Sequence, residues 1–452
     1  MLIRYSVENF LSYKDRQVFS MVAGQTTKHR NHIYEANGKR VLKGSFFFGA
    51  NASGKSNIIE SIKFSKSIVE DGVKRGRLKD KHFRIDPSYI NKPGVFQYDI
   101  FTNGHFYSYG FSISYSAAKI LNEWLYLCDK SEVQIFERFN DGTEPSTETS
   151  LKFSSKDNKK RFQLFAEDVS DTRTLLLEIS EKKIIDHPDF QAIKDVVDWF
   201  NNLTILTPRS QLINKNRLME DVSTSLSLEN MLAYFDTGIC SVIQKEESLE
   251  DILKFVSPDE RAEMLEQLEE SFTQGDPEYG IPDSAVLKLM DEQYEIHAED
   301  GKLLVSHLMS DHGNADDLFL LTDESDGTQR LFDLIPVLLD LQKTAVFLID
   351  ELDRSFHTKL VWNFIETFYT LAGSSPSQLI ASVHDVNIMD LNLLRRDEIW
   401  FVERLKDHSS RIFSLNKFQD RYDKVVSKDY LLGRYGAIPC LSQPDELERG
   451  ES

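Results

Sequence analysis

Residues 45–57, SFFFGANASGKSN, decide the fold of this chain. They begin with an apolar run typical of a buried strand and end where a helical pattern opens. Between the two, residues 49–56 match the phosphate-loop pattern G-x-x-x-x-G-K-[ST] at every fixed position. The alternative is a chance Gly/Ser turn before a helix, and the flanking strand and helix argue against it. The stretch predicts a binding site for a nucleoside triphosphate.

Each part of this loop has a physical role in holding phosphate. Glycines let the backbone turn tightly, so main-chain N–H groups and the helix N-terminus point at one anion. Lys55 is expected on the β- and γ-phosphates of ATP, and the Ser56 hydroxyl on Mg²⁺. The loop residues expected at the nucleotide are Gly49, Asn51, Ala52, Ser53, Gly54, Lys55, Ser56 and Asn57.

Composition limits the function classes. The 452 residues carry a formal net charge of -20, which argues against a chain-wide surface for nucleic acid. A basic cluster at residues 74–81 is interpreted as a solvated loop. The three cysteines form no CxxC pair, and no apolar run approaches the roughly 20 residues that span a bilayer. We therefore expect a cytoplasmic protein with no membrane partner.

The chain divides into three parts by pattern. Residues 1–140 contain the phosphate loop and a series of strands, including a hairpin around Thr102-Asn103-Gly104. Residues 141–300 are predicted to be a mainly helical insertion, with a Glu-rich helical pattern at 246–272. Residues 301–452 return to alternating strands and helices, including a strand at 344–349 and another at 378–382.

Two carboxylates follow the predicted strand at 344–349, in the run AVFLIDE. An Asp at the carboxyl end of a buried strand is well placed to hold a cation beside a phosphate loop, so Asp350 is the expected second Mg²⁺ contact. The adjacent Glu351 could polarise a water for attack on the γ-phosphate. The same pattern also ends many purely structural strands, and only the upstream phosphate loop favours function.

Two further motifs lie in the C-terminal part. ESDGTQR at 324–330 places Ser325, Gly327 and Thr328 at the start of a predicted helix, where they could cradle an anion. The structural alternative is that Ser325 simply caps that helix. SVHD at 382–385 ends the next strand, and His384 could hydrogen-bond a γ-phosphate or its attacking water.

In this order, the phosphate loop, ESDGTQR, LIDE and VHD resemble the ABC-type ATPases of the SMC, RecF and OLD branch. ESDGTQR takes the place of the ABC signature, with Asp326 where the family has its first Gly; LIDE takes that of Walker B, and His384 that of the switch histidine. SDGTQRLF, FLIDELDRSFH, LLRRDEIWFVE and YLLGRYGAIP are similar to the abortive-infection ATPases related to RloA and AbiL. Gln97 is a candidate for the family's glutamine loop.

The resemblance implies an α/β P-loop fold of the ABC-head type, a mixed sheet with an antiparallel β-subdomain. It also implies a head-to-tail dimer with ATP and Mg²⁺ between subunits, in which Ser325 and Gly327 face the partner's phosphate loop. The implied role is anti-phage defence, with hydrolysis driven by Glu351 and a separately encoded effector of the Toprim nuclease type.

Two alternatives remain. An OLD-like nuclease would need a Toprim domain, but no D-x-D occurs after His384. A RecF-like or SMC-like ATPase for DNA maintenance would bind DNA, a partner that the residues neither indicate nor exclude.

Overall fold

The computed structural model describes residues 1–140, 146–208, 227–258, 261–262, 264–265, 284–289, 292–299, 302–314, 316–342, 345–418 and 425–438. By internal contacts the chain forms two compact units. The first combines Met1–Pro208 with Leu341–Ser452, and the second is Arg209–Asp340. The chain therefore leaves the first unit once and returns to it.

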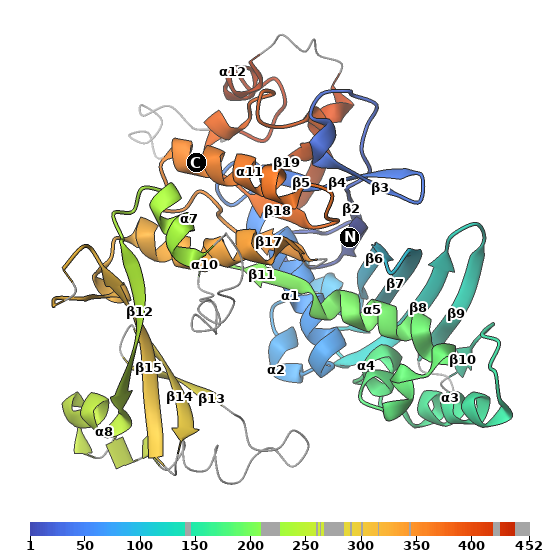
Figure 1. Cartoon of the computed structure of the whole chain (residues 1–452). Coiled ribbons are helices and arrows are strands. Elements are labelled where there is room, and N and C mark those ends of the chain that lie inside the picture. The colour runs from blue at the N-terminus through green and yellow to red at the C-terminus, as the bar shows by residue number, and fades with distance from the viewer. Residues whose placement is uncertain are drawn as a thin grey trace. The chain divides into compact units, whose positions relative to one another are not determined.

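A six-stranded sheet carries the predicted phosphate loop (Figure 1). Its order is β11-β17-β18-β5-β19-β20, and every neighbouring pair is parallel except β19 with β20. The strands are β5 (Gly44–Phe48), β11 (Leu203–Leu206), β17 (Val346–Ile349), β18 (Gln378–Ser382), β19 (Ile399–Arg404) and β20 (Ser410–Ser414). Parallel strands end at one edge, so whatever follows β5, β17 and β18 meets there.

A seven-stranded antiparallel sheet forms the β-subdomain, in the order β10-β9-β8-β7-β6-β1-β2. It contains β1 (Leu2–Glu8), β2 (Gln17–Ser20), β6 (Gly94–Thr102), β7 (His105–Ser114), β8 (Lys119–Cys128), β9 (Glu132–Phe139) and β10 (Ser146–Glu148). The predicted hairpin joins β6 to β7, with positive φ at Asn103 and Gly104. The mixed sheet and the antiparallel sheet confirm the predicted α/β class.

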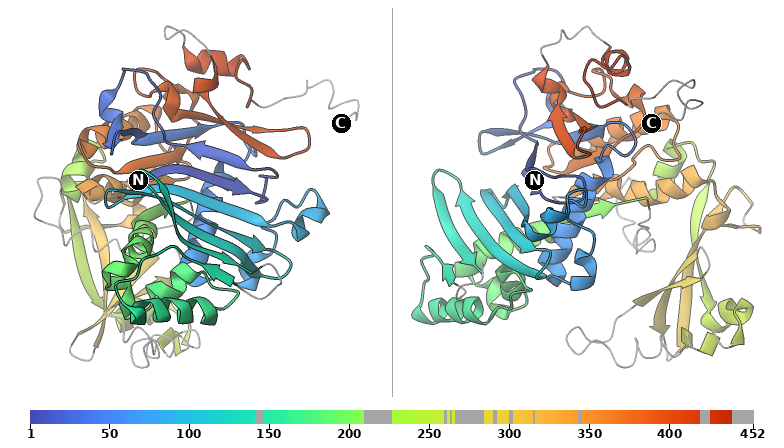
Figure 2. Two further views of the ribbon diagram at one scale, coloured as in Figure 1. Left: turned by 90° about the vertical axis from the view of Figure 1, so that its right-hand side faces the viewer. Right: turned by 180° about the vertical axis from the view of Figure 1, so that it is seen from behind.

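Helices cover these sheets in the first unit: α1 (Lys55–Asp71), α2 (Arg75–Leu78), α3 (Lys156–Asp168), α4 (Leu175–Ser180), α5 (Gln191–Asn201), α11 (Thr358–Ala372) and α12 (Val426–Leu431). Figure 2 shows α3 to α5 lying beside the antiparallel strands. Phe162, Leu176 and Phe200 from these helices are buried in the same hydrophobic core as Tyr5 and Tyr98 of the sheet. Residues 146–208 are thus integral to this unit.

The second unit differs from the mainly helical insertion expected at 141–300. It contains β12 (Ser241–Ser248), β13 (Ser284–Leu289), β14 (Glu292–Glu299), β15 (Lys302–Asp311) and β16 (Phe319–Leu320), with α7 (Leu228–Tyr234), α8 (Leu249–Ile252) and α10 (Asp326–Leu339). Its five strands form one sheet. Of the helical stretch expected at 246–272, residues 246–248 instead end β12, because they pair with β15. The chain is then helical, as predicted, in α8 and in a 3-10 turn at Leu253–Phe255. Residues 259–260, 263 and 266–272 lie outside the described residues.

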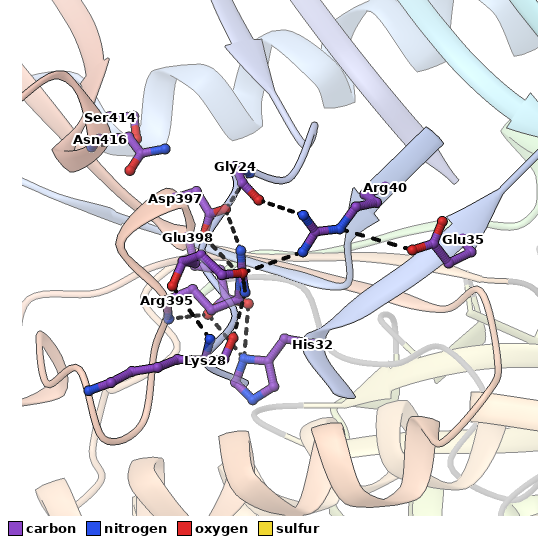
Figure 3. A network of polar contacts seen from close by, with 11 residues as sticks. Gly24, Lys28, His32, Glu35, Arg40, Arg395, Asp397, Glu398, Ser414 and Asn416 are labelled. Atoms are coloured by element: carbon purple, nitrogen blue, oxygen red, sulfur yellow. Dashed lines mark hydrogen bonds and ion pairs between the residues drawn. The ribbon is translucent and has the colours of Figure 1, made fainter. Parts of the chain in front are cut away.

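A buried network of charges joins residues 24–32 to the start of β19 (Figure 3). Arg395 is fully buried and donates to both carboxylate oxygens of Asp397, at 2.9 and 2.7 Å. Asp397 also accepts from the Gly24 N–H at 2.6 Å, and His32 Nδ1 lies 3.0 Å from Glu398. Burial lowers the pKa of His32 to about 3, which keeps the ring neutral. This network fixes the strand next to β5.

Candidate nucleotide site

The phosphate loop joins β5 to α1, as the sequence predicts. Ala52 and Gly54 have left-handed backbone conformations, with φ of 60° and 107°. A side chain at Gly54 would also clash, because its Cβ would lie 2.4 Å from Ser410 Oγ and 2.8 Å from Ser12 Oγ. Both the conformation and the close approach therefore require glycine here.

Lys55 lies inside the curve of the loop, and only 4% of its surface is exposed. Its Nζ donates to the main-chain carbonyls of Gly49 at 2.8 Å and Ala50 at 3.1 Å. Burial lowers the pKa of Lys55, while the nearby Asp350, Asp353 and Glu351 raise it. A bound polyphosphate would favour the charged ammonium, so this donor set fits the nucleotide that the motif predicts.

Side chains from distant parts of the sequence support the back of the loop. The Tyr13 hydroxyl donates to the Gly54 carbonyl at 2.9 Å, and the Asn57 side chain donates to Ser12 Oγ at 2.7 Å. Ser410 Oγ lies 2.7 Å from Ser12 Oγ and 2.6 Å from the carbonyl of Ser53. Sequence reasoning missed Ser12, Tyr13 and Ser410, because only the tertiary structure brings them to the loop.

The predicted loop residues therefore occupy different environments. Asn51 and Ala52 are exposed, whereas Ser53 is buried and its hydroxyl has no hydrogen-bond partner among the residues that the structure describes. The side chain of Asn57 points to the supporting Ser12. Ser56, the predicted magnesium contact, is exposed in the first turn of α1.

Asp350 and Glu351 lie at the carboxyl end of β17, on the strand next to β18. One hydroxyl connects them: Ser382 Oγ donates to Asp350 Oδ1 at 2.5 Å and accepts from the Glu351 N–H at 2.8 Å. Glu351 has a φ of 51°, a conformation that a non-glycine residue adopts only when its surroundings hold it there. Ser382 is the first residue of the SVHD motif, and the sequence pattern alone predicts no role for it. Its position at the end of a predicted strand was the one signal that could have indicated a place in the site.

His384 joins the same group of residues. Its Nε2 lies 3.7 Å from Glu351 Oε1. Asp353 fixes the backbone there, because one of its carboxylate oxygens accepts from the N–H groups of His384 at 2.8 Å and Asp385 at 2.6 Å. The structure thus brings Glu351 and His384 together from two neighbouring strands, in a geometry suited to orienting a water molecule.

Ser325, Gly327 and Thr328 lie in the second unit, at the start of α10. Ser325 is the N-cap: its Oγ accepts from the Thr328 N–H at 3.2 Å and lies 2.9 Å from the Thr328 hydroxyl. The preceding Glu324 accepts from His312 Nε2 at 2.8 Å. Ser325 therefore caps α10, as the structural alternative expects. Its predicted contact with nucleotide stays a prediction.

Two other predictions can be compared with the structure. Gln97 lies on β6 and hydrogen-bonds Arg16, Asp99 and Ser108, none of which belongs to the phosphate loop or to the β17 end. In the basic cluster, residues 75–78 form the short helix α2 where a loop was predicted, and the exposed Lys74 and Arg77 both pair with Asp71. Within the described ranges, no group of three or more His, Cys, Asp or Glu could hold a metal by itself.

A phosphate loop followed by a helix, with two carboxylates at the end of a parallel strand two places away in the same sheet, defines this chain as a P-loop protein of the nucleoside-triphosphate-binding class. A family model described as "AAA domain, putative AbiEii toxin, Type IV TA system" matches residues 45–390. The chain belongs to that family, and the resemblance to abortive-infection ATPases is confirmed at that level.

Comparison with curated proteins gives no match. Among solved structures, the chain is similar to an SMC head bound to the C-terminal winged-helix domain of ScpA, at 13% identity and a TM-score of 0.39. The alignment covers 91% of this chain and 97% of that one. An SMC head domain from Thermotoga maritima gives 12% identity and a TM-score of 0.34, covering 91% and 98%. Among the described residues, no helix is both long and apolar enough to cross a membrane.

Proposed function

We propose that this protein binds and hydrolyses ATP, and that it regulates an anti-phage response through a separate effector. The observation that carries the proposal is the meeting of Lys55, Asp350 and Glu351 at one edge of the parallel sheet. The Lys55 ammonium group would bind the β- and γ-phosphates of ATP. Asp350 and Ser56 would hold Mg²⁺, and the bound ion would neutralise negative charge on the phosphates.

The chain's own residues then divide the work of hydrolysis. Glu351, held by its N–H bond to Ser382, would accept a proton from the attacking water. His384, 3.7 Å from that carboxylate, would orient the same water or contact the γ-phosphate. The two residues come from adjacent strands, so their separation is set by the sheet.

The test is the variant Glu351→Gln, which preserves the shape of the side chain and removes its basicity. We expect ATP turnover to fall at least about a hundredfold, while ATP binding stays within about twofold of wild type. The matched control is Glu366→Gln, an exposed side chain on α11 in the same unit. Unchanged turnover in the Glu351 variant would rule out the assignment.

We also propose that two chains close around ATP in a head-to-tail dimer. Ser325, Gly327 and Thr328 at the start of α10 would complete the site of the other chain, since a helix N-terminus favours an anion. Under this proposal, the Glu351→Gln variant accumulates as an ATP-dependent dimer in size-exclusion chromatography. Adding Ser325→Arg should return it to a monomer without abolishing ATP binding to the single chain.

Charge favours a protein effector over DNA as the partner of the second unit. Between residues 209 and 340 there are 30 Asp or Glu and 9 Lys or Arg, a net formal charge of -21. The rest of the chain therefore carries 44 basic and 43 acidic residues, or +1. A surface this acidic repels nucleic acid and attracts a basic protein surface. Co-purification with the product of a neighbouring reading frame should weaken as salt is raised.

The family description supplies a second candidate function, because it names a toxin. If this chain were itself the toxic component, its expression alone would arrest growth. We expect no arrest from the chain alone, and arrest only when the effector is co-expressed. Growth arrest by wild type but not by Glu351→Gln, with no partner present, would favour the toxin.

A further inference from the structure

The C-terminal motif at 430–438 has no part in the function proposed so far. It begins in the last turn of α12 and lies against β19, the strand beside the phosphate-loop strand. Phe401 of β19 stacks with two tyrosines of this segment: Tyr430 at 5.4 Å between ring centres and 7° between planes, and Tyr435 at 5.5 Å and 18°. Both tyrosines are buried. The aromatic stack fixes the segment on the sheet.

From this position the segment contacts the phosphate loop through one main-chain carbonyl. The Ala50 N–H donates to the Ala437 carbonyl at 2.9 Å. The Tyr430 hydroxyl donates to the same carbonyl at 2.8 Å. Burial raises the pKa of Tyr430 to about 12, so the hydroxyl keeps its proton at neutral pH. The carbonyl oxygen of Ala437 thus accepts two hydrogen bonds, one from the phosphate loop and one from its own segment.

The contact matters because it involves a single peptide unit of the loop. The N–H of Ala50 and the carbonyl of Gly49 belong to the same trans peptide, so they point in opposite directions. The Ala50 N–H donates to the Ala437 carbonyl, and the Gly49 carbonyl accepts from Lys55 Nζ at 2.8 Å. Rotation of this peptide would therefore move the acceptor that keeps Lys55 in place.

The conformation of the segment is itself specific. Gly436 and Ala437 have φ of 70° and 57°. A Cβ at Gly436 would lie 2.6 Å from Glu403 Oε1, and the Ala437 N–H lies 3.4 Å from the same oxygen. A side chain at Gly436 is therefore disfavoured by the positive φ and would also displace the Glu403 carboxylate.

We propose that residues 430–437 position the phosphate loop for nucleotide, with Tyr430 and Ala437 orienting the Gly49–Ala50 peptide. The inference rests on the proposed nucleotide site and adds a positioning element to it. It makes docking of the segment and binding of ATP mutually dependent, because each favours the same orientation of that peptide. Tyr430 acts through Ala437 and touches neither the nucleotide nor the reacting atoms.

The test uses two substitutions in the full-length protein. Tyr430→Phe keeps the stack on Phe401 and removes the hydroxyl, and Gly436→Ala displaces the segment without altering the loop. For each we expect the Kd for a fluorescent ATP analogue to rise about fivefold, as for the loss of one buried hydrogen bond, with kcat at saturating ATP changed less than twofold. Hydrogen exchange at the Ala50 amide, measured without nucleotide, should become faster.

Matched controls separate this role from general destabilisation. Tyr126→Phe removes a hydroxyl that donates to Glu137 in the antiparallel sheet. Gly38→Ala places a side chain at a φ of 81° with no atom within 4 Å. Neither control should change nucleotide affinity or exchange at the loop.

The outcomes distinguish this inference from the proposed function. Unchanged affinity and unchanged Ala50 exchange in both variants would overturn the positioning role, even with normal ATP binding by wild type. Failure of wild type to bind ATP would instead refute the nucleotide site. The exchange measurement needs no nucleotide, so it would still show whether the segment holds the peptide.

Discussion

Ser382 offers the sharpest test of how the catalytic end of the sheet is organised. Its hydroxyl donates to Asp350 at 2.5 Å and accepts from the Glu351 N–H at 2.8 Å, and the residue is 1% exposed. Ser382→Ala removes both bonds and adds no bulk. Asp350 then loses a donor, and Glu351 loses the bond that holds its left-handed backbone.

The size of the effect follows from the contacts. A hydrogen bond to a charged group contributes about 1.5–3 kcal/mol, and each 1.4 kcal/mol is about tenfold in rate. If the bond is made in the transition state, kcat should fall roughly 10- to 100-fold. Affinity for ATP should change less than about twofold, because Lys55 and the loop backbone are untouched.

The assay is steady-state phosphate release with nucleotide affinity measured separately. Ser377→Ala is the matched control: Ser377 is equally buried and immediately precedes the same strand, and its hydroxyl donates to the Leu341 carbonyl at 3.2 Å. Both variants should lose similar stability, but only Ser382→Ala should lose turnover. Equal kcat values for the two variants would refute the claim that this hydroxyl organises the carboxylates.

Three further perturbations are predicted. Gly54→Ala should weaken nucleotide binding at least about tenfold in fluorescence titrations, because the new methyl group meets two hydroxyls behind the loop. Arg395→Met should lower the free energy of unfolding by about 3–5 kcal/mol in urea titrations, since it leaves the buried carboxylate of Asp397 unpaired. The hydrogen bond to Glu324 raises the pKa of His312, so its contribution to stability is present below about pH 6.5 and lost as the pH rises through the raised value. His312→Gln should flatten that dependence in denaturation midpoints measured from about pH 6 to 8.

Each of these has a control in the same chain. Gly76→Ala should bind nucleotide normally, since no described atom beyond its chain neighbours and its own helix backbone lies within 4 Å of the added methyl group. Arg161→Met breaks an exposed pair with Asp157 and should cost no more than about 1 kcal/mol. His105→Gln, which removes an exposed pair with Asp129, should leave the pH dependence of the second unit intact. A control that behaves like its test variant would contradict the corresponding prediction.

Local patterns were sufficient for the nucleotide-binding half of this protein. Residues 45–57 predicted the strand, loop and helix, because that motif depends on backbone conformations encoded by adjacent residues. The strand ending in Asp350 and the hairpin at Thr102-Asn103-Gly104 were predictable for the same reason. These are features whose determinants lie within a few residues of one another.

Other features depended on contacts between distant residues. The helical pattern beginning at Glu246 holds from Leu249 onward, yet residues 246–248 belong to a strand because they pair with β15 some sixty residues away. Ser12, Ser410 and Ala437 support the phosphate loop although nearly 400 residues separate the first two from one another.

Sequence alone therefore determined the phosphate loop and predicted its ligand, because phosphate recognition is built from neighbouring backbone N–H groups. Only the tertiary structure decided what holds the loop and its carboxylates in position. Ser382 reaches Asp350 and Glu351 because parallel strands align their ends. The carbonyl of Ala437 reaches the Gly49–Ala50 peptide because the segment after α12 packs on Phe401 of β19.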